Sequence, residues 1–174
     1  ALSSAASDVY KRQIITFVDT PGAYPGLGAE ERGQGEAIAR NLLEMSRLKT
    51  PIISIVIGEG SSGGALGICV ADKIVMLENA VYSVLSPEGF ASILYKDASK
   101  HKEAAEHMKI TANDLMELNV IDEIIQEPEG GAGENIEKVA SEIKKYILNS
   151  LKELEKIDKK DLVNSRYEKY RRIK

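Results

Sequence analysis

Short apolar runs mark the strands of this chain. Residues 14–18 form one run, and residues 52–57 form a longer one that is rich in β-branched side chains. Nearly unbroken runs of this kind are typical of strands covered on both faces, as in a parallel sheet. Similar patterns predict further strands over 73–77, 81–85 and 120–125.

Apolar stripes at helical spacing separate these strands. Ile38, Leu42 and Met45 follow one another at i, i+4 and i+7 in a helix expected to begin near Ala29. The alternation of strands and helices predicts an α/β fold with right-handed crossovers. Three further helices are predicted over 65–71, 87–95 and 98–108, and a fourth is expected to begin after the N-cap Thr111. A fifth is expected to run from Glu134, with an apolar stripe of Ile136, Ala140, Ile143, Ile147, Leu151 and Leu154.

Both ends of the chain differ from this pattern. Residues 1–12 are small and polar, and we expect a disordered or non-native tail outside the fold. Residues 13–150 are expected to form the domain, which opens directly on a strand and is therefore predicted to be truncated at its N-terminus. Residues 151–174 carry many charges of both signs and are expected to form a solvated helical tail.

The composition narrows the classes of function. The 174 residues carry 23 Lys and Arg against 27 Asp and Glu, and the net charge of −4 gives no drive toward nucleic acid or an anionic membrane. One Cys excludes an internal disulfide, and with two His a zinc site in this chain is not expected. No apolar run reaches the ~18 residues of a membrane span, and the first residues do not resemble a secretory signal. We therefore expect a cytoplasmic protein.

A glycine-rich segment, residues 58–64, follows the second predicted strand. Its Gly58, Gly60 and Gly63 fit the G-x-G-x-x-G motif of dinucleotide-binding domains, and Glu78 lies where a ribose-binding acid is expected. That motif usually opens its domain, whereas here a strand and a helix come first. An NAD(P)-binding oxidoreductase therefore stays as an alternative function.

The same segment also fits the G-x-S-x-G nucleophile elbow of serine hydrolases through Gly60, Ser62 and Gly64. A hydrolase needs a base beside Ser62. The two histidines, His101 and His107, lie in a Lys- and Glu-rich stretch that indicates an exposed helix. A hydrolase is therefore disfavoured.

A second turn of similar kind, residues 19–26, follows the first predicted strand. Asp19 and Gly22 fit the D-x-x-G switch of GTPases, but the sequence has neither a G-x-x-x-x-G-K-[ST] motif nor an Asn-Lys-x-Asp motif. The glycines either let a helix pack closely on the sheet or expose backbone N–H groups near two strand ends. Such N–H groups can bind an oxyanion.

Taken together, the two turns resemble one known family closely. D-T-P-G-A-Y-P-G at residues 19–26 and G-E-G-S-S-G-G-A-L at 58–66 resemble the carboxyltransferase α subunits of bacterial-type acetyl-CoA carboxylases. The resemblance covers about residues 13–150. Further matching segments are 29–39, 86–94 and 121–125.

The resemblance implies a fold and a reaction. The fold is that of the crotonase and ClpP-like group, a spiral of ββα units, here with a C-terminal helical extension. The reaction is transfer of a carboxyl group from carboxybiotin, held on biotin carboxyl carrier protein, to acetyl-CoA, which gives malonyl-CoA for fatty acid biosynthesis. ClpP-like proteases place their Ser where Ser62 lies and their His at about residues 84–86, where this chain has none.

The resemblance also implies partners. The chain would be active only with a β subunit, in an α2β2 heterotetramer, and biotin carboxylase would be the component that uses ATP. The cofactor is biotin on the carrier protein, and no metal is expected in this chain. An inactive fragment that only binds the β subunit is the other alternative.

The implied chemistry requires oxyanion stabilisation. Loss of CO2 from carboxybiotin leaves negative charge on the ureido oxygen, and deprotonation of the acetyl group places charge on the thioester oxygen, so backbone N–H donors are expected. By resemblance, the donors are Gly22 or Ala23 in the first turn and Gly63 or Gly64 in the second. The residues expected to bind biotin or CoA are Tyr24, Pro25, Gly26, Gly60, Ser61 and Ser62. The alternative role for the two serines is to cap the next helix.

Overall fold

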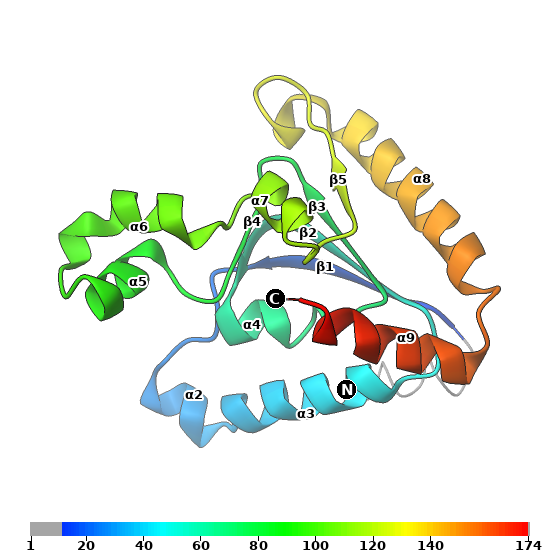
Figure 1. Ribbon diagram of the computed structural model, residues 1–174, viewed down its shortest axis with the longest axis horizontal. Coiled ribbons are helices and arrows are strands. Elements are labelled where there is room, and N and C mark those ends of the chain that lie inside the picture. The colour runs from blue at the N-terminus through cyan, green and yellow to red at the C-terminus, as the bar shows by residue number, and fades with distance from the viewer. Residues whose placement is uncertain (1–11, 174) are drawn as a thin grey trace.

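A parallel β-sheet forms the centre of the molecule (Figure 1). The structure is a computed structural model that describes residues 12–173, so most of the expected N-terminal tail and residue 174 lie outside the described residues. The strands pair in the order β1-β2-β3-β5, and β4 pairs with the end of β2. Their bounds are β1 (Ile14–Thr20), β2 (Ile52–Ser61), β3 (Lys73–Leu77), β4 (Val81–Ser83) and β5 (Glu123–Ile125).

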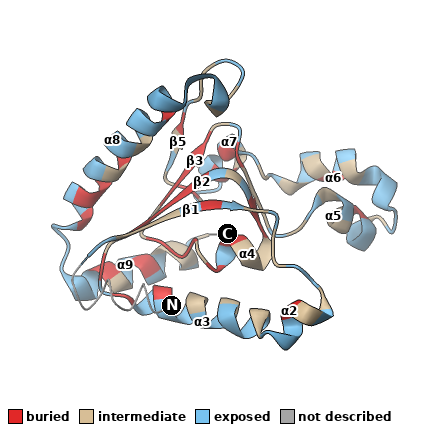
Figure 2. Cartoon of the chain, turned by 180° about the vertical axis from the view of Figure 1, so that it is seen from behind, coloured by how far each residue is buried: buried red, intermediate tan, exposed pale blue. Residues whose placement is uncertain are grey.

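Helices surround this sheet. Figures 1 and 2 show α3, α4 and α9 along one side and α8 along another, with buried positions concentrated on the sheet and on the helix faces toward it. The helices are α2 (Leu27–Glu31), α3 (Gln34–Arg47), α4 (Ser62–Leu66), α5 (Pro87–Leu94), α6 (His101–Met108), α7 (Ala112–Glu117), α8 (Ile136–Leu154) and α9 (Lys159–Arg171), with 3-10 turns η1 (Ala98–Lys100) and η2 (Ala132–Asn135).

The core confirms the sequence-based fold class. Ile52, Ile53, Ile55 and Val56 of β2 are completely buried, because β2 lies between β1 and β3 and is covered on both faces. This is the environment that the unbroken apolar run predicted. The α/β architecture with a parallel sheet is therefore confirmed.

Several element boundaries differ from the prediction. The helix expected near Ala29 is split into α2 and α3, because Gly33 takes a left-handed conformation with φ 73°. The strand expected to stop at residue 57 runs on to Ser61, because β4 pairs with its last three residues. Ile136, expected on the buried stripe of α8, is 70 % exposed.

The segment from α5 to α6 forms an arm, defined here as residues 87–108. Its helices α5 and α6 pack on one another, Ala91 and Ala104 are buried, and the arm projects away from the sheet (Figure 1). Ile93 and Leu94 on α5 are both 60 % exposed.

The C-terminal helix α9 packs against the body of the molecule. Leu162 and Arg166 are each 2 % exposed, so the expectation of a solvated tail is wrong for this face of α9. The boundary expected at residue 150 lies inside α8. No helix within residues 12–173 is long and apolar enough to cross a membrane.

Candidate active site

The two glycine turns lie against each other at the carboxyl ends of β1 and β2. A Cβ atom on Gly64 would lie 2.9 Å from the carbonyl carbon of Gly22 and 3.1 Å from the amide nitrogen of Ala23. A Cβ atom on Gly22 would lie 3.4 Å from the Cβ of Ser62. The fold therefore brings both pairs of expected donors to one place, with a contact at position 64 that leaves no room for a side chain.

Asp19 holds the two strand ends together. Its Oδ1 accepts a hydrogen bond from the amide of Glu59 at 3.0 Å, beside an irregularity in the register after Val18. A Cβ atom on Gly58 would lie only 2.6 Å from the same oxygen, so Gly58 makes room for this carboxylate. Asp19, which the sequence presented as part of a GTPase-like pattern, is a structural link between the turns.

The amide groups of the turns differ in their partners. The amide of Gly22 donates to Oγ1 of Thr20 at 3.3 Å. Within residues 12–173, the amides of Ala23, Gly63 and Gly64 have no acceptor in the protein. Unpaired N–H groups are rare in partly buried positions and attract anions. Of the two expected donors in the first turn, Gly22 therefore has an amide with a protein acceptor and Ala23 has one without an acceptor among residues 12–173.

Ser61 and Ser62 occupy the junction of β2 and α4. Ser62 has a φ of 54°, an uncommon conformation for a residue with a side chain. Ser61 is the N-cap residue of α4, but its hydroxyl makes no cap hydrogen bond and instead lies 3.4 Å from a carboxylate oxygen of Glu59. The expectation that Ser61 caps the helix is therefore wrong.

The histidines lie on the arm, not beside Ser62. His101 and His107 belong to α6, and Nδ1 of His107 is hydrogen-bonded to the hydroxyl of Tyr95 on the same arm. The left-handed serine is compatible with a nucleophile elbow, but neither histidine is placed to act as its base (Figure 1).

The dinucleotide pattern is also not realised. Gly58 and Gly60 lie within β2, where Gly60 pairs with Thr20 on one side and Tyr82 on the other. Oε2 of Glu78 accepts a hydrogen bond from the amide of Glu127 at 3.2 Å, so this carboxylate stabilises the loop that follows β5. A ribose-binding role for Glu78 has no geometric support.

The first turn continues into an exposed loop. Tyr24 is 72 % exposed, and its ring covers Gly26, where a Cβ atom would lie 2.1 Å from the ring. With its amide oriented to satisfy both groups, Gln34 donates to the carbonyl of Tyr24 at 2.8 Å and accepts from its amide at 3.2 Å. Gln34 lies in the segment 29–39 that resembles the family, but the sequence did not predict that it fixes the loop. Its partner is the backbone of Tyr24, ten positions earlier, and only the tertiary fold places the two side by side.

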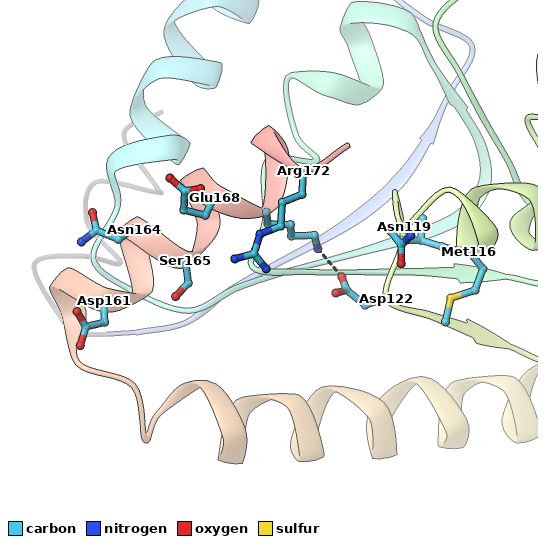
Figure 3. A pocket seen from close by; sticks show the side chains of 10 residues that line it. Met116, Asn119, Asp122, Asp161, Asn164, Ser165, Glu168 and Arg172 are labelled. Carbon is cyan, nitrogen blue, oxygen red and sulfur yellow. Dashed lines mark hydrogen bonds and ion pairs between the residues drawn. The ribbon is translucent and has the colours of Figure 1, made fainter. Parts of the chain in front are cut away.

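Two cavities deserve comparison. One of about 250 Å³ lies beside the second turn and includes Gly63 among its lining. A larger one of about 820 Å³ lies between α9 and the segment before β5, where Asp122 pairs with Lys169 (Figure 3). The larger cavity is at the amino end of β5, away from both turns, and none of the expected site residues lines it. Figure 3 shows the lining side chains on α9, which are Asp161, Asn164, Ser165, Glu168 and Arg172, and those on the opposite side of the cavity, which are Met116, Asn119 and Asp122.

The described residues offer little metal chemistry. Across residues 12–173, no three or more His, Cys, Asp or Glu side chains gather in a way that could hold a metal ion. The single cysteine, Cys69, is buried, and burial raises the pKa of its thiol.

Comparison with known proteins gives a consistent result. The family model described as acetyl co-enzyme A carboxylase carboxyltransferase-like matches residues 2–174. The acetyl-coenzyme A carboxylase carboxyl transferase subunit alpha of Clostridium botulinum is 62 % identical over 167 residues, which are 96 % of this chain and 61 % of that protein. The protein of the same name from Fusobacterium nucleatum is 58 % identical over 164 residues, 94 % of this chain and 52 % of its own length. The chain thus spans about three fifths or less of these relatives.

Solved structures share the fold. Transcarboxylase 12S with methylmalonyl-coenzyme A bound has a TM-score of 0.64 at 22 % identity, covering 71 % of this chain and 26 % of that one. A malonate decarboxylase heterodimer from Pseudomonas has a TM-score of 0.65 at 15 % identity, covering 84 % of this chain and 64 % of that one. These likenesses confirm the crotonase-like fold class expected from the turn motifs.

Proposed function

The chain belongs to the acetyl co-enzyme A carboxylase carboxyltransferase-like family, and from this premise we propose that it supplies the α-subunit half of a carboxyltransferase site. The reaction moves a carboxyl group from carboxybiotin to acetyl-CoA and forms malonyl-CoA for fatty acid biosynthesis. Biotin is carried by biotin carboxyl carrier protein and is charged by biotin carboxylase, and the expected cytoplasmic location belongs to the same proposal.

The observation that carries this proposal is the meeting of the two turns. Ala23, Gly63 and Gly64 present amides that have no acceptor among residues 12–173, and Gly64 is in backbone contact with Gly22 and Ala23. A site of this kind stabilises a developing oxyanion and needs no side-chain nucleophile. Removing one such donor typically costs ~3–4 kcal/mol of transition-state stabilisation.

These residues fit the ureido group of biotin. Its oxygen is a hydrogen-bond acceptor that gains negative charge as the carboxyl group departs, and this is the chemistry that biotin supplies when bound. The amides of Ala23 and Gly64 would hold that oxygen, while Gln34 fixes the backbone of Tyr24 at the edge of the turn. The half-buried positions of the turns limit water around the donors, which strengthens their effect.

The second substrate requires a partner in this proposal. The β subunit would bind acetyl-CoA and face the turns from outside, in an α2β2 assembly. Support comes from the α-subunit names of the relatives and from the multi-subunit neighbours, among them the malonate decarboxylase heterodimer. The arm with its exposed Ile93 and Leu94 offers an apolar surface for such a subunit.

The reverse reaction tests the proposal directly. Malonyl-CoA and a biotin derivative are incubated with the chain, with the β subunit added or omitted, and acetyl-CoA is measured. Formation of acetyl-CoA only with both proteins present is expected. A folded chain that binds the β subunit without turnover would identify it as an inactive fragment, and loss of both binding and turnover would contradict the proposal.

A further inference from the structure

A bulge in β2 precedes the second glycine turn. The strands β1 and β2 pair in regular parallel register up to Val18 and Val56. Pairing resumes at Thr20 and Gly60, so β1 advances by two residues where β2 advances by four. The strand β2 therefore holds two extra residues opposite Asp19. Extra residues of this kind shift every residue that follows them along the strand.

This shift decides which residues of the two turns meet. Without the two extra residues, Thr20 would pair with Gly58 instead of Gly60. Because a strand rises about 3.3 Å per residue, the second turn would then lie about 7 Å further along β1. A displacement of that size is larger than the length of a hydrogen bond, about 3 Å. The contact of Gly64 with the backbone of Gly22 therefore depends on the bulge.

The bulge lies where β2 changes its neighbours. The strand β3 pairs with β2 up to Val56, and β4 pairs with it from Glu59 onwards. In the part of the chain that the structure describes, no strand pairs with Ile57 or Gly58. The side chain of Ile57 is also 37 % exposed. This stretch lacks the ladder and the burial that hold the rest of β2, so its shape depends on side-chain contacts.

Asp19 supplies such a contact. Its Oδ1 accepts a hydrogen bond from the amide of Glu59 at 3.0 Å, in the place of the β1 carbonyl that would accept in a regular ladder. A Cβ atom on Gly58 would lie 2.6 Å from the same oxygen, so the glycine leaves the space that the carboxylate fills. Asp19 and Glu59 each lie four positions before a residue of the oxyanion site, Ala23 and Gly63 respectively.

We propose that Asp19 is a positioning residue for the oxyanion site. Its carboxylate fixes the shape of the bulge in β2 and thereby sets the offset between the amide donors of the two turns. This inference rests on the proposed function, under which the amides of Ala23 and Gly64 hold the ureido oxygen of biotin. Asp19 acts on these donors through the backbone and does not contact the substrate.

Three substitutions test the contact between Asp19 and Glu59. Asp19→Ala removes the acceptor, and Asp19→Asn keeps an acceptor oxygen without the charge. Gly58→Ala places a methyl group against the carboxylate and displaces it from the amide. Asp19 is exposed, so the buried core stays intact. The matched control is Asp158→Ala at the start of α9, where another exposed carboxylate accepts a backbone amide, that of Lys160, at 2.9 Å.

The reverse reaction with the β subunit gives kcat and KM. Asp19→Ala is expected to lower kcat about a hundredfold, because a misplacement of about 1 Å suffices for such a loss. The KM for malonyl-CoA stays within about twofold, because the β subunit binds malonyl-CoA in this proposal. Asp19→Asn keeps kcat within about fivefold of the wild type, since a neutral acceptor is weaker but remains in place. Asp158→Ala leaves both parameters unchanged. Equal losses in the two Asp19 variants, or full kcat in Asp19→Ala, would overturn the proposal.

The double variant tests whether Asp19 and Gly58 act through one contact. Gly58→Ala and Asp19→Ala both break the hydrogen bond to Glu59, so the double variant is expected to lose no more kcat than the more damaging single variant. Losses that multiply would mean that the two residues act independently. That result would overturn the assignment of Asp19.

A measurement without turnover separates this inference from the proposed function. Amide proton and nitrogen chemical shifts of Ala23, Gly63 and Gly64 are recorded by NMR on the full chain. Asp19→Ala is expected to change them and Asp158→Ala is not. If the wild type forms no acetyl-CoA with the β subunit but these shifts respond to Asp19→Ala alone, the positioning role holds and carboxyl transfer does not. Shifts that Asp19→Ala leaves unchanged would overturn the positioning role whatever the turnover.

Discussion

Arg166 of α9 and Asp72, the residue before β3, form a buried pair with side chains 1 % and 4 % exposed. Nε and Nη2 of Arg166 donate to the two carboxylate oxygens at 2.9 and 2.8 Å. The remaining guanidinium donors reach the carbonyls of Met45, Leu48 and Thr50 at 2.8 to 3.0 Å. All five N–H groups of the arginine are therefore used, and the C-terminal helix is joined to the end of α3 and the start of β2.

The same arrangement occurs twice along α9. Oδ2 of Asp72 also accepts a hydrogen bond from the amide of Ile52. Oδ2 of Asp122 accepts a hydrogen bond from the amide of Ile74 and forms an ion pair with Lys169. Each aspartate precedes one strand and bonds to the start of the neighbouring strand. The cations of α9, one helical turn apart, stabilise both aspartates and so hold the amino ends of the sheet.

Arg166→Met is expected to destabilise the fold strongly. It leaves the Asp72 carboxylate and three carbonyls buried without their partner, which typically costs about 3–5 kcal/mol. Urea unfolding followed by circular dichroism measures the change. Arg171→Met, at an exposed residue paired with Glu168 at 3.7 Å, serves as control and should leave stability nearly unchanged. Equal effects of the two variants would show that the buried pair is not important.

Gly64→Ala is expected to abolish most transfer activity. Its Cβ would lie 2.9 Å from the backbone of the first turn, so the two turns must separate and the donors lose their alignment. A loss of about a hundredfold or more in kcat is expected, comparable to removal of an oxyanion donor. Gly63→Ala is the matched control, because its Cβ would meet only the flexible Ile38 side chain at 3.4 Å. If Gly63→Ala is the more damaging change, the contact between the turns is not what positions the donors.

Ser62→Ala is expected to change transfer activity only a few-fold. The serine hydroxyl makes no hydrogen bond to the protein within residues 12–173, and neither histidine lies beside it. Steady-state kinetics of the reverse reaction measures this. A loss above a hundredfold would instead indicate nucleophilic chemistry at Ser62.

Ile93→Asp on the arm is expected to weaken association with the β subunit about tenfold or more. Ile93 is 60 % exposed, so a charge there leaves folding intact but is costly in an apolar interface. Sedimentation or calorimetry gives the dissociation constant. Lys102→Ala on α6 changes the net charge by the same amount and should leave binding within about twofold. Unchanged binding for both variants would exclude the arm as the contact surface.

Cys69 is expected to resist thiol reagents in the native state. It is 1 % exposed, and burial raises the pKa of its thiol, so the reactive thiolate forms only at a pH above the usual range. Labelling between pH 7 and 9 should stay far slower than for a free thiol and become rapid in denaturant. Fast labelling of the folded protein would contradict this environment.

The sequence alone determined the local features of this protein. The β-branched run of β2 predicted a strand buried on both faces, because both faces of such a strand are apolar and exposing either to water is unfavourable. The order of residues in the two glycine turns carried the family and hence the fold, and both turns stand at strand ends as expected. These features depend on neighbouring residues, so a linear pattern can contain them.

Only the tertiary structure decided the relationships between distant segments. It extended β2 through Gly60, because β4 returns to pair there, and it placed Gly64 in contact with Gly22. It also showed that the amide of Gly22 donates a hydrogen bond, while that of Ala23 has no acceptor in the described part of the chain. It buried Arg166 in a helix that the sequence pattern predicted to be solvated. The charges and the spacing of residues within one segment do not predict such contacts, because the partner that accepts a hydrogen bond or excludes water comes from elsewhere in the chain.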